Sequence, residues 1–166
     1  MKKKRQKEAE KRLNQRTMLV PVDFSYCSRL ALRKAYELLN REEGKIVAFH
    51  VIDHHFIEKC VRHDLGNEGE IKKNLYLEAK RRLHTFLFHE QKNGIEAEAA
   101  IGEGEPFVEI NKKAIELDAD MIVMGSCGKA NDMNTIFFGS TAEKVLRFIT
   151  RPVLCVPPDT EYRNVG

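Results

Sequence analysis

The residues best suited to chemistry lie between 119 and 145, where glycines and hydroxyl side chains follow an apolar run. The apolar run, 121–124, leads into Gly-Ser-Cys-Gly at 125–128, and Gly-Ser-Thr at 139–141 begins an amphipathic segment. This order predicts a buried strand, a glycine-containing loop and a helix whose first turn offers free N–H groups and hydroxyls. Because the N–H groups and the helix dipole both attract anions, we expect a nucleotide phosphate to bind there.

Alternating strand-like and helical segments are expected to position that loop. The expected strands are residues 17–23, 46–52, 95–101, 120–124 and 152–156. The expected helices run from Ser25 to near Gly44 and over residues 70–93, 106–117 and 140–149. Residues 54–69 have poor periodicity, which predicts a mobile connection with at most a short helical turn over 56–61. The alternation predicts a parallel sheet with helices on both faces.

Length and composition are those of a single globular domain. The chain has 166 residues, 42% of them hydrophobic and 32% charged, enough for a full core without disulfides or a structural metal. The apolar runs are far shorter than the roughly 18 residues of a membrane-spanning helix, so no membrane association is expected. The four cysteines form no C-x-x-C pair, and the start of the chain lacks the apolar core of a secretory signal. These features predict a reducing, cytoplasmic compartment.

Basic residues are concentrated at the start of the chain. Residues 1–16 contain eight Lys or Arg and two Glu, although the net charge of the whole chain is only +3. No aromatic residues are interleaved with them, so we favour a solvated tail over a contact with nucleic acid. The expected organisation is a basic N-terminal tail (1–16), one domain (17–159) and a short C-terminal tail (160–166).

Acidic residues and glycines stand where several expected strands end. In an open α/β sheet, ligands bind beyond the carboxyl ends of the strands, at the point where the strand order reverses. Asp23, Asp53, the glycines at 102 and 104, and the loop 125–128 occupy these ends. If the first and fourth strands are neighbours, Asp23 faces the glycine loop and can accept a hydrogen bond from an amine or a ribose hydroxyl. The alternative role of Asp23 is to cap the helix that follows, and both roles can coexist.

Four short motifs occupy the same strand ends. They are VPVDFS at 20–25, HVID at 50–53, the glycines of 125–128 with Gly-Ser at 139–140, and RPVLCVP at 151–157. Together they resemble the universal stress protein family, the UspA-like domain, over about residues 17–158. The resemblance implies a Rossmann-like α/β fold of the adenine nucleotide alpha hydrolase-like type, with a five-stranded parallel sheet in the order 3-2-1-4-5. It also implies a homodimer and, in one branch of the family, bound ATP.

The same resemblance assigns roles to individual residues. The adenine contacts and the walls of the adenine pocket would be Asp23, the backbone of Val51, Pro21 and Val22. The ribose and phosphate site would be shaped by Met124, Gly125 and Gly128. The phosphates would be held at the helix start by Gly139, Ser140 and Thr141, with Lys129 as the loop's only cation.

Two departures from the family pattern fall in the same loop. Ten residues separate Gly128 from Gly139, where the pattern has nine. Cys127 stands where relatives often carry a basic residue or histidine. We expect a stress-response module that binds ATP, with or without magnesium, and signals to an unidentified protein partner. The alternative is a UspA-like interaction scaffold without nucleotide. In either case the last strand, 152–156, is expected to pair in a homodimer because its edge is otherwise open.

Cys127 also suggests a different chemistry. A thiol close to backbone N–H groups and Lys129 can become reactive and act as a redox sensor. No second cysteine lies near it in sequence, so we favour the interpretation that Cys127 is a small residue tolerated in a loop.

A further group of side chains has metal-ligand chemistry: His54, His55, Glu58, Cys60 and His63. They show neither H-E-x-x-H nor paired C-x-x-C spacing, so a solvated loop is the favoured interpretation and no metal site is assigned. Ser140 lacks a G-x-S-x-G context, and no histidine can be assigned as its base. No catalytic residue is therefore assigned; slow ATP hydrolysis is compatible with the sequence, whereas an efficient enzyme is not indicated.

Overall fold

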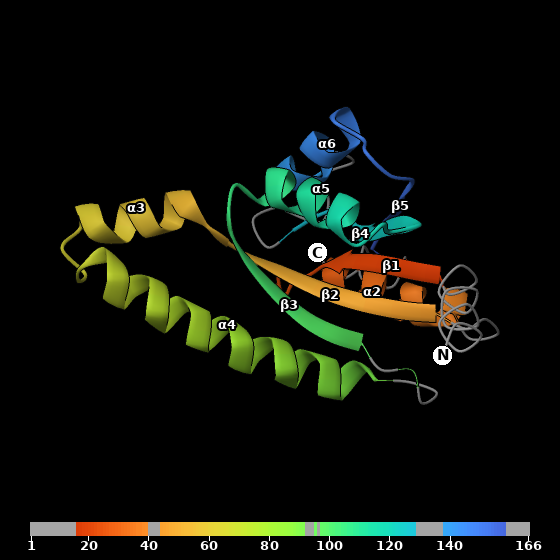
Figure 1. Cartoon of the computed structure of the whole chain (residues 1–166), viewed down its shortest axis with the longest axis horizontal. Coiled ribbons are helices and arrows are strands. Elements are labelled where there is room, and N and C mark those ends of the chain that lie inside the picture. Colours follow the sequence, from red (N-terminus) through yellow and green to blue (C-terminus); the bar gives the residue numbers. More distant parts are fainter. Residues whose placement is uncertain (1–15, 40–43, 92–94, 96, 129–137, 159–166) are drawn as a thin grey trace, which may run out of the picture.

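The computed structural model describes residues 16–39, 44–91, 95, 97–128 and 138–158. Most of both expected tails and Lys129 therefore lie outside the described residues. Five strands form one parallel sheet in the order β3-β2-β1-β4-β5 (Figure 1). The strands are β1 (Arg16–Pro21), β2 (Gly44–Asp53), β3 (Ala97–Gly104), β4 (Met121–Gly125) and β5 (Val153–Val156). The α/β fold class and the strand order expected from the resemblance are confirmed.

Helices cover both faces of this sheet. They are α2 (Tyr26–Leu39), α3 (His54–Arg62), α4 (Glu68–Glu90), α5 (Pro106–Glu116) and α6 (Ser140–Arg147). Among the described residues, no helix is long and apolar enough to cross a membrane. Each strand begins or ends within a few residues of its expected position, and β3 lies at an edge of the sheet, as expected.

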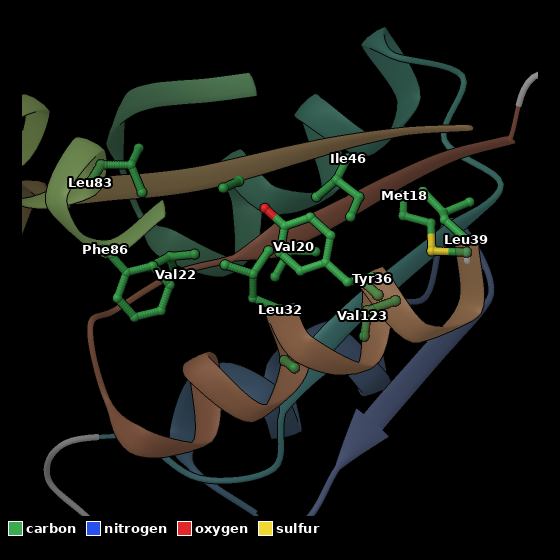
Figure 2. Packing of buried hydrophobic residues seen from close by; sticks show 13 residues of the cluster. Met18, Val20, Val22, Leu32, Tyr36, Leu39, Ile46, Leu83, Phe86 and Val123 are labelled. Carbon is green, nitrogen blue, oxygen red and sulfur yellow. The ribbon is translucent and has the colours of Figure 1, made fainter. Parts of the chain in front are cut away.

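The alternation of side chains along β1 divides the core into two layers. Val20 belongs to one buried cluster with Leu32 and Tyr36 of α2 and Phe86 of α4, whose side chains Figure 2 shows together. Leu19, the preceding residue, points to the opposite face and belongs to the layer that contains the buried residues of α5 and α6. Both faces of a central parallel strand are buried, so its sequence is a continuous apolar run. Strand β1 is thereby fixed at the centre of the sheet.

The segment expected to be an irregular connection is instead helical. Residues 54–62 form α3, and Figure 1 shows α3 and the first half of α4 extending beyond the sheet; we call residues 54–76 the α3–α4 arm. Asp53 accepts a hydrogen bond from the His55 N–H at 2.9 Å and thus caps α3. Asn67 caps α4 in the same way through the Glu70 N–H. Ile57 is the only buried residue of α3. The histidines and glycines of 54–69 interrupt the pattern around it, so the sequence predicted at most a short turn over 56–61.

The carboxyl end of α4 is fixed to α2 by a buried carboxylate. Glu90 has a side-chain exposure of only 2%, and it accepts hydrogen bonds from Arg29 Nη1 at 2.7 Å and Arg33 Nε at 2.6 Å. Burial raises the pKa of Glu90, but hydrogen bonds from the two guanidinium groups outweigh this effect and hold the pKa below its ordinary value. This charged cluster therefore fixes the carboxyl end of α4 to α2. Within the arm, Lys72 forms an ion pair with Glu103 of β3 at 2.7 Å, and Ile57 and Ile71 pack in one buried cluster with Ile52 of β2.

Candidate functional site

A cavity of about 280 Å³ opens at the carboxyl ends of the central strands, where the strand order reverses. Its lining includes every site residue expected from the sequence except Lys129, which is not among the described residues. These lining residues are Pro21, Val22, Asp23, Val51, Met124, Gly125, Gly128, Gly139, Ser140 and Thr141. The tertiary structure therefore brings the ends of three strands and the start of α6 around one space.

Asp23 performs two tasks at one end of this cavity. Its Oδ1 accepts a hydrogen bond from the Ser25 N–H at 2.9 Å, which orients the turn into α2. Ser25 in turn caps α2, because its Oγ accepts a hydrogen bond from the Ser28 N–H at 3.1 Å. The second oxygen of Asp23, Oδ2, lies toward Gly128, 2.9 Å from the position that a Cβ there would occupy. The local turn therefore uses one carboxylate oxygen and directs the other to the glycine loop.

Two glycines allow the loop after β4 to approach the start of α2. A Cβ at Gly125 would lie 2.6 Å from the Cβ of Cys27 and 2.7 Å from its carbonyl carbon. Neither atom can move without shifting the backbone of α2, so only glycine fits there. At Gly128, a Cβ would collide with the Asp23 carboxylate. The short distances explain why glycine occurs at both positions.

The first turn of α6 forms the other end of the cavity. Gly139 donates its N–H to the Ser126 carbonyl at 2.8 Å, which returns the chain to the loop after β4. Gly139 is also the N-cap of α6 and supplies no side-chain hydrogen bond to the turn. The first intrahelical bond in the described chain runs from the Glu143 N–H to the Gly139 carbonyl at 2.9 Å. Within the described residues, no side chain caps the N–H groups of residues 140–142, which lie beside the cavity and can attract an anion.

Apolar side chains form the wall between these two ends. Val22 and Met124 are buried at 3% and 4% exposure, and Ile110 of α5 is equally buried. The sequence interpretation missed several lining residues: Ser28, Phe49, His50, Pro106, Ile110, Cys127 and Ala142. Pro106 follows the Gly-Glu-Gly-Glu sequence at 102–105, where β3 ends, and that position at a strand end was the available signal. The remaining residues reach the cavity only because of how the helices pack.

Cys127 has a partner that its sequence neighbourhood does not reveal. It forms a disulfide with Cys27, with a Cα–Cα distance of 6.0 Å and a sequence separation of 100 residues. The interpretation of Cys127 as an unpaired loop residue is therefore wrong. That interpretation considered only nearby cysteines, whereas the strand order places the loop after β4 on the start of α2. Cys60 and Cys155 remain free thiols.

The histidine-rich part of the arm lies away from the cavity lining. Glu58 contacts both neighbouring histidines, with His54 Nε2 at 3.1 Å and His55 Nδ1 at 3.4 Å, and all three side chains are exposed. Within the described residues, no group of three or more His, Cys, Asp and Glu side chains has the arrangement of a metal site. These contacts are those of surface pairs along one helix.

Comparison with known proteins adds to this geometry. A sequence model described as the universal stress protein family matches residues 15–157. The chain belongs to the universal stress protein family. A universal stress protein of Methanocaldococcus jannaschii is 33% identical over 153 residues, which cover 84% of this chain and 93% of that relative. Universal stress protein YxiE of Bacillus subtilis is 29% identical and covers 84% of this chain and 97% of its own length.

Solved structures show the same fold. The structure of the Methanocaldococcus jannaschii protein has a TM-score of 0.75 at 30% identity, with 87% of this chain and 97% of that chain covered. A universal stress protein of Archaeoglobus fulgidus, solved in complex with dAMP, has a TM-score of 0.61 at 26% identity, with coverages of 85% and 96%. In the present chain, ten residues separate Gly128 from Gly139, and the Gly139 N–H still donates a hydrogen bond to the Ser126 carbonyl.

Proposed function

We propose that this universal stress protein binds an adenine nucleotide, ATP, in the cavity between β1 and β4 and acts as a regulatory module in a stress response. The observation that carries the proposal is the opposite polarity of the cavity's two ends. Asp23 presents a carboxylate oxygen at one end, and α6 presents the N–H groups of its first turn at the other. Between these two ends, Val22, Met124 and Ile110 form an apolar wall of the same cavity.

This polarity favours one orientation of the ligand. The adenine amine and the ribose hydroxyls are hydrogen-bond donors, which suit the Asp23 carboxylate. A phosphate would be repelled by Asp23 and attracted by the first turn of α6. The purine would be sandwiched by apolar side chains between these polar ends. The Archaeoglobus fulgidus relative in complex with dAMP supports an adenine nucleotide as the ligand class.

The size of the cavity is consistent with part of the nucleotide being enclosed. Its volume of about 280 Å³ is close to the lower end of the range of roughly 300–1,000 Å³ for small-molecule sites. Base and ribose would occupy the enclosed part, and the phosphates would extend along the start of α6. Magnesium, when bound, would be held mainly by phosphate oxygens. Binding, and not a chemical step, is the proposed activity.

Asp23 and Asp53 provide a matched pair for testing this proposal. Asp53 is the last residue of β2, and Asp23 follows the neighbouring β1 by two residues. The Oδ1 of each accepts a hydrogen bond at 2.9 Å from the N–H two residues later, but only Asp23 lines the cavity. Calorimetric titration with ATP, with and without magnesium, should show that Asp23→Asn weakens binding about tenfold, because a hydrogen bond to a charged acceptor is lost. Asp53→Asn should bind ATP like the wild type.

Two outcomes would contradict the proposal in different ways. Equal ATP affinities for the two variants would remove Asp23 from the site. The absence of ATP binding, together with no adenine nucleotide released when the purified protein is heated, would favour the nucleotide-free interaction scaffold. The heating step is needed because a nucleotide that copurifies with the protein would mask added ATP.

We also propose that the protein is cytoplasmic and forms a homodimer through β5. In the described part of the chain, Val153–Val156 pairs only with β4, and all four residues are half-buried. An edge strand of this kind can pair with a second copy of itself. Sedimentation velocity at micromolar concentration should show a dimer, and a monomer would contradict this part of the proposal.

A further inference from the structure

We propose that Cys27 and Cys127 form a reversible disulfide that regulates the affinity of the cavity for its nucleotide. The inference rests on the proposed function, because it concerns the same cavity. The two cysteines bring a thiol–disulfide couple to the point where α2 and the loop after β4 meet. The class of modification is thiol oxidation by a low-molecular-weight disulfide.

The two cysteines belong to the two elements that build the Asp23 end of the cavity. Cys27 is the second residue of α2 and is 1% exposed, whereas Cys127 is half-buried and lines the cavity. Their Cα–Cα distance of 6.0 Å lies in the usual range for a disulfide. Gly128, which follows Cys127 directly, approaches the Asp23 carboxylate. The disulfide therefore ties the glycine loop to the helix that Asp23 and Ser25 begin.

The surroundings favour a reversible, regulatory disulfide over a permanent structural one. Two buried clusters, one on each face of the sheet, already form a full core, so the fold does not need a cross-link. In a reducing compartment, the disulfides that do form are usually transient and regulatory. Cys60 and Cys155 are free and do not line the cavity, so the chain contains two control thiols.

The chemistry requires one external disulfide and balances as an exchange reaction. Cys127, the more exposed thiol, attacks a low-molecular-weight disulfide as its thiolate, forms a mixed disulfide and releases the first thiol. The Cys27 thiolate then attacks the Cys127 sulfur and expels the second thiol. The two protein thiols lose two electrons and two protons in total, and the small disulfide is reduced to two thiols. Excess small thiol reverses both steps.

The expected direction of regulation follows from the position of the bond. In the oxidised form the loop is held against α2, with Gly128 next to Asp23, so the ligand does not have to order this part of the site. Such preorganisation increases affinity, and we expect the oxidised protein to bind ATP about three- to tenfold more tightly than the reduced protein. By linkage, ATP must shift the thiol–disulfide equilibrium toward the disulfide by the same factor.

The experiment measures the disulfide and the affinity separately. The full-length protein is equilibrated in glutathione buffers of graded redox poise, and peptide mass spectrometry reports the fraction of chain in which the peptides containing Cys27 and Cys127 are linked. Calorimetry then gives the ATP dissociation constant of the oxidised and reduced forms. We expect linked peptides, a dissociation constant that is lower in the oxidised form, and a linked fraction that rises when ATP is added.

Single substitutions provide the matched controls. Cys127→Ser should make ATP affinity independent of redox poise. Cys27→Ser should do the same, but Cys127 is the main test because its substitution disturbs the core less. Cys60→Ser and Cys155→Ser should keep the full redox response.

Each contrary result has a distinct meaning. The absence of a Cys27–Cys127 linkage at every redox poise would overturn the proposal. Linked peptides with ATP affinities that are measurable and equal in both forms would overturn the regulation alone. The absence of ATP binding in both forms would overturn the regulation together with the proposed function, whatever the state of the cysteines.

Discussion

The cavity and the α3–α4 arm are built from different kinds of contact. At the cavity, the loop after β4 meets α2 through Gly125, Gly128 and a disulfide between residues 100 positions apart. In the arm, the stabilising contacts include helix caps from Asp53 and Asn67 and ion pairs between residues three or four positions apart. The cavity therefore depends on long-range packing, and the arm depends more on local sequence.

This difference predicts how each region responds to change. A Cβ added at Gly125 would collide with Cys27 and must displace the backbone of another element. A Cβ added at Gly69 of the arm would make only an ordinary contact with Asn67 of the same segment. Substitutions at matched residue types in the two regions should therefore differ in size and even in sign, and the following four test that expectation.

Gly125→Ala should have the largest effect on stability. The added Cβ would lie within 2.7 Å of both the Cβ and the carbonyl carbon of Cys27, so α2 or the loop has to shift. We expect the free energy of unfolding to fall by about 3 kcal/mol. Urea denaturation under reducing conditions measures this without the disulfide. A loss below about 1 kcal/mol would show that the loop yields more easily than its contacts with α2 suggest.

Glu90→Gln, at the carboxyl end of α4, should have the second-largest effect on stability. The substitution removes the charge that Arg29 and Arg33 bind. We expect the free energy of unfolding to fall by about 2 kcal/mol, a loss that is limited because the two arginines are partly exposed. The pKa of Glu90 is lowered in the folded protein from an ordinary value of 4.5. Its contribution is therefore complete above that value and disappears as the pH falls through the folded pKa.

The pH dependence of this second variant provides its own check. Urea unfolding of the wild type and Glu90→Gln should show a constant difference at neutral pH. The difference should shrink as the pH is lowered from about 4.5. A difference that does not change between pH 7 and strongly acidic conditions would mean that the carboxylate charge contributes nothing.

Asn67→Ala should lower the free energy of unfolding less than Glu90→Gln does, and its effect should be confined to the arm. Asn67 Oδ1 accepts the Glu70 N–H at 2.9 Å and caps α4. Loss of such a cap costs about 1 kcal/mol. Hydrogen exchange should become faster in the first turn of α4 and remain unchanged in β1 and β4. Faster exchange throughout the sheet would instead couple the arm to the cavity.

Gly69→Ala is the arm's counterpart to Gly125→Ala and should have the opposite sign. A Cβ at Gly69 would meet only Asn67 Oδ1, at an ordinary contact distance of 3.5 Å. Alanine has the higher helix propensity, so we expect stability to increase by about 0.5 kcal/mol. The midpoint of urea unfolding measures this. A destabilisation close to that of Gly125→Ala would remove the distinction between the two regions.

The sequence predicted the structure best where a local pattern has a single physical cause, such as burial of a strand or capping of a helix. The apolar runs around Val20 and Val123 predicted two of the strands, and both residues are buried in the core. The cap at Ser25 and the start of α6 at Ser140 were also predicted correctly. Helix α3 was predicted only as a short turn over 56–61, because the histidines and glycines of 54–69 obscured the helical spacing of Ile57, Cys60 and Val61.

The sequence by itself determined the succession of the five strands and of the helices other than α3. Its motifs, by resemblance to a known family, predicted the strand order and the residues that would face a ligand. Only the tertiary structure decided that Asp23 directs one oxygen to Gly128, that Ile110 supplies a wall of the cavity, and that Cys27 meets Cys127. Burial leaves a periodic pattern along the chain. Contacts between elements that are distant in sequence leave none, because they depend on how the sheet and its helices pack.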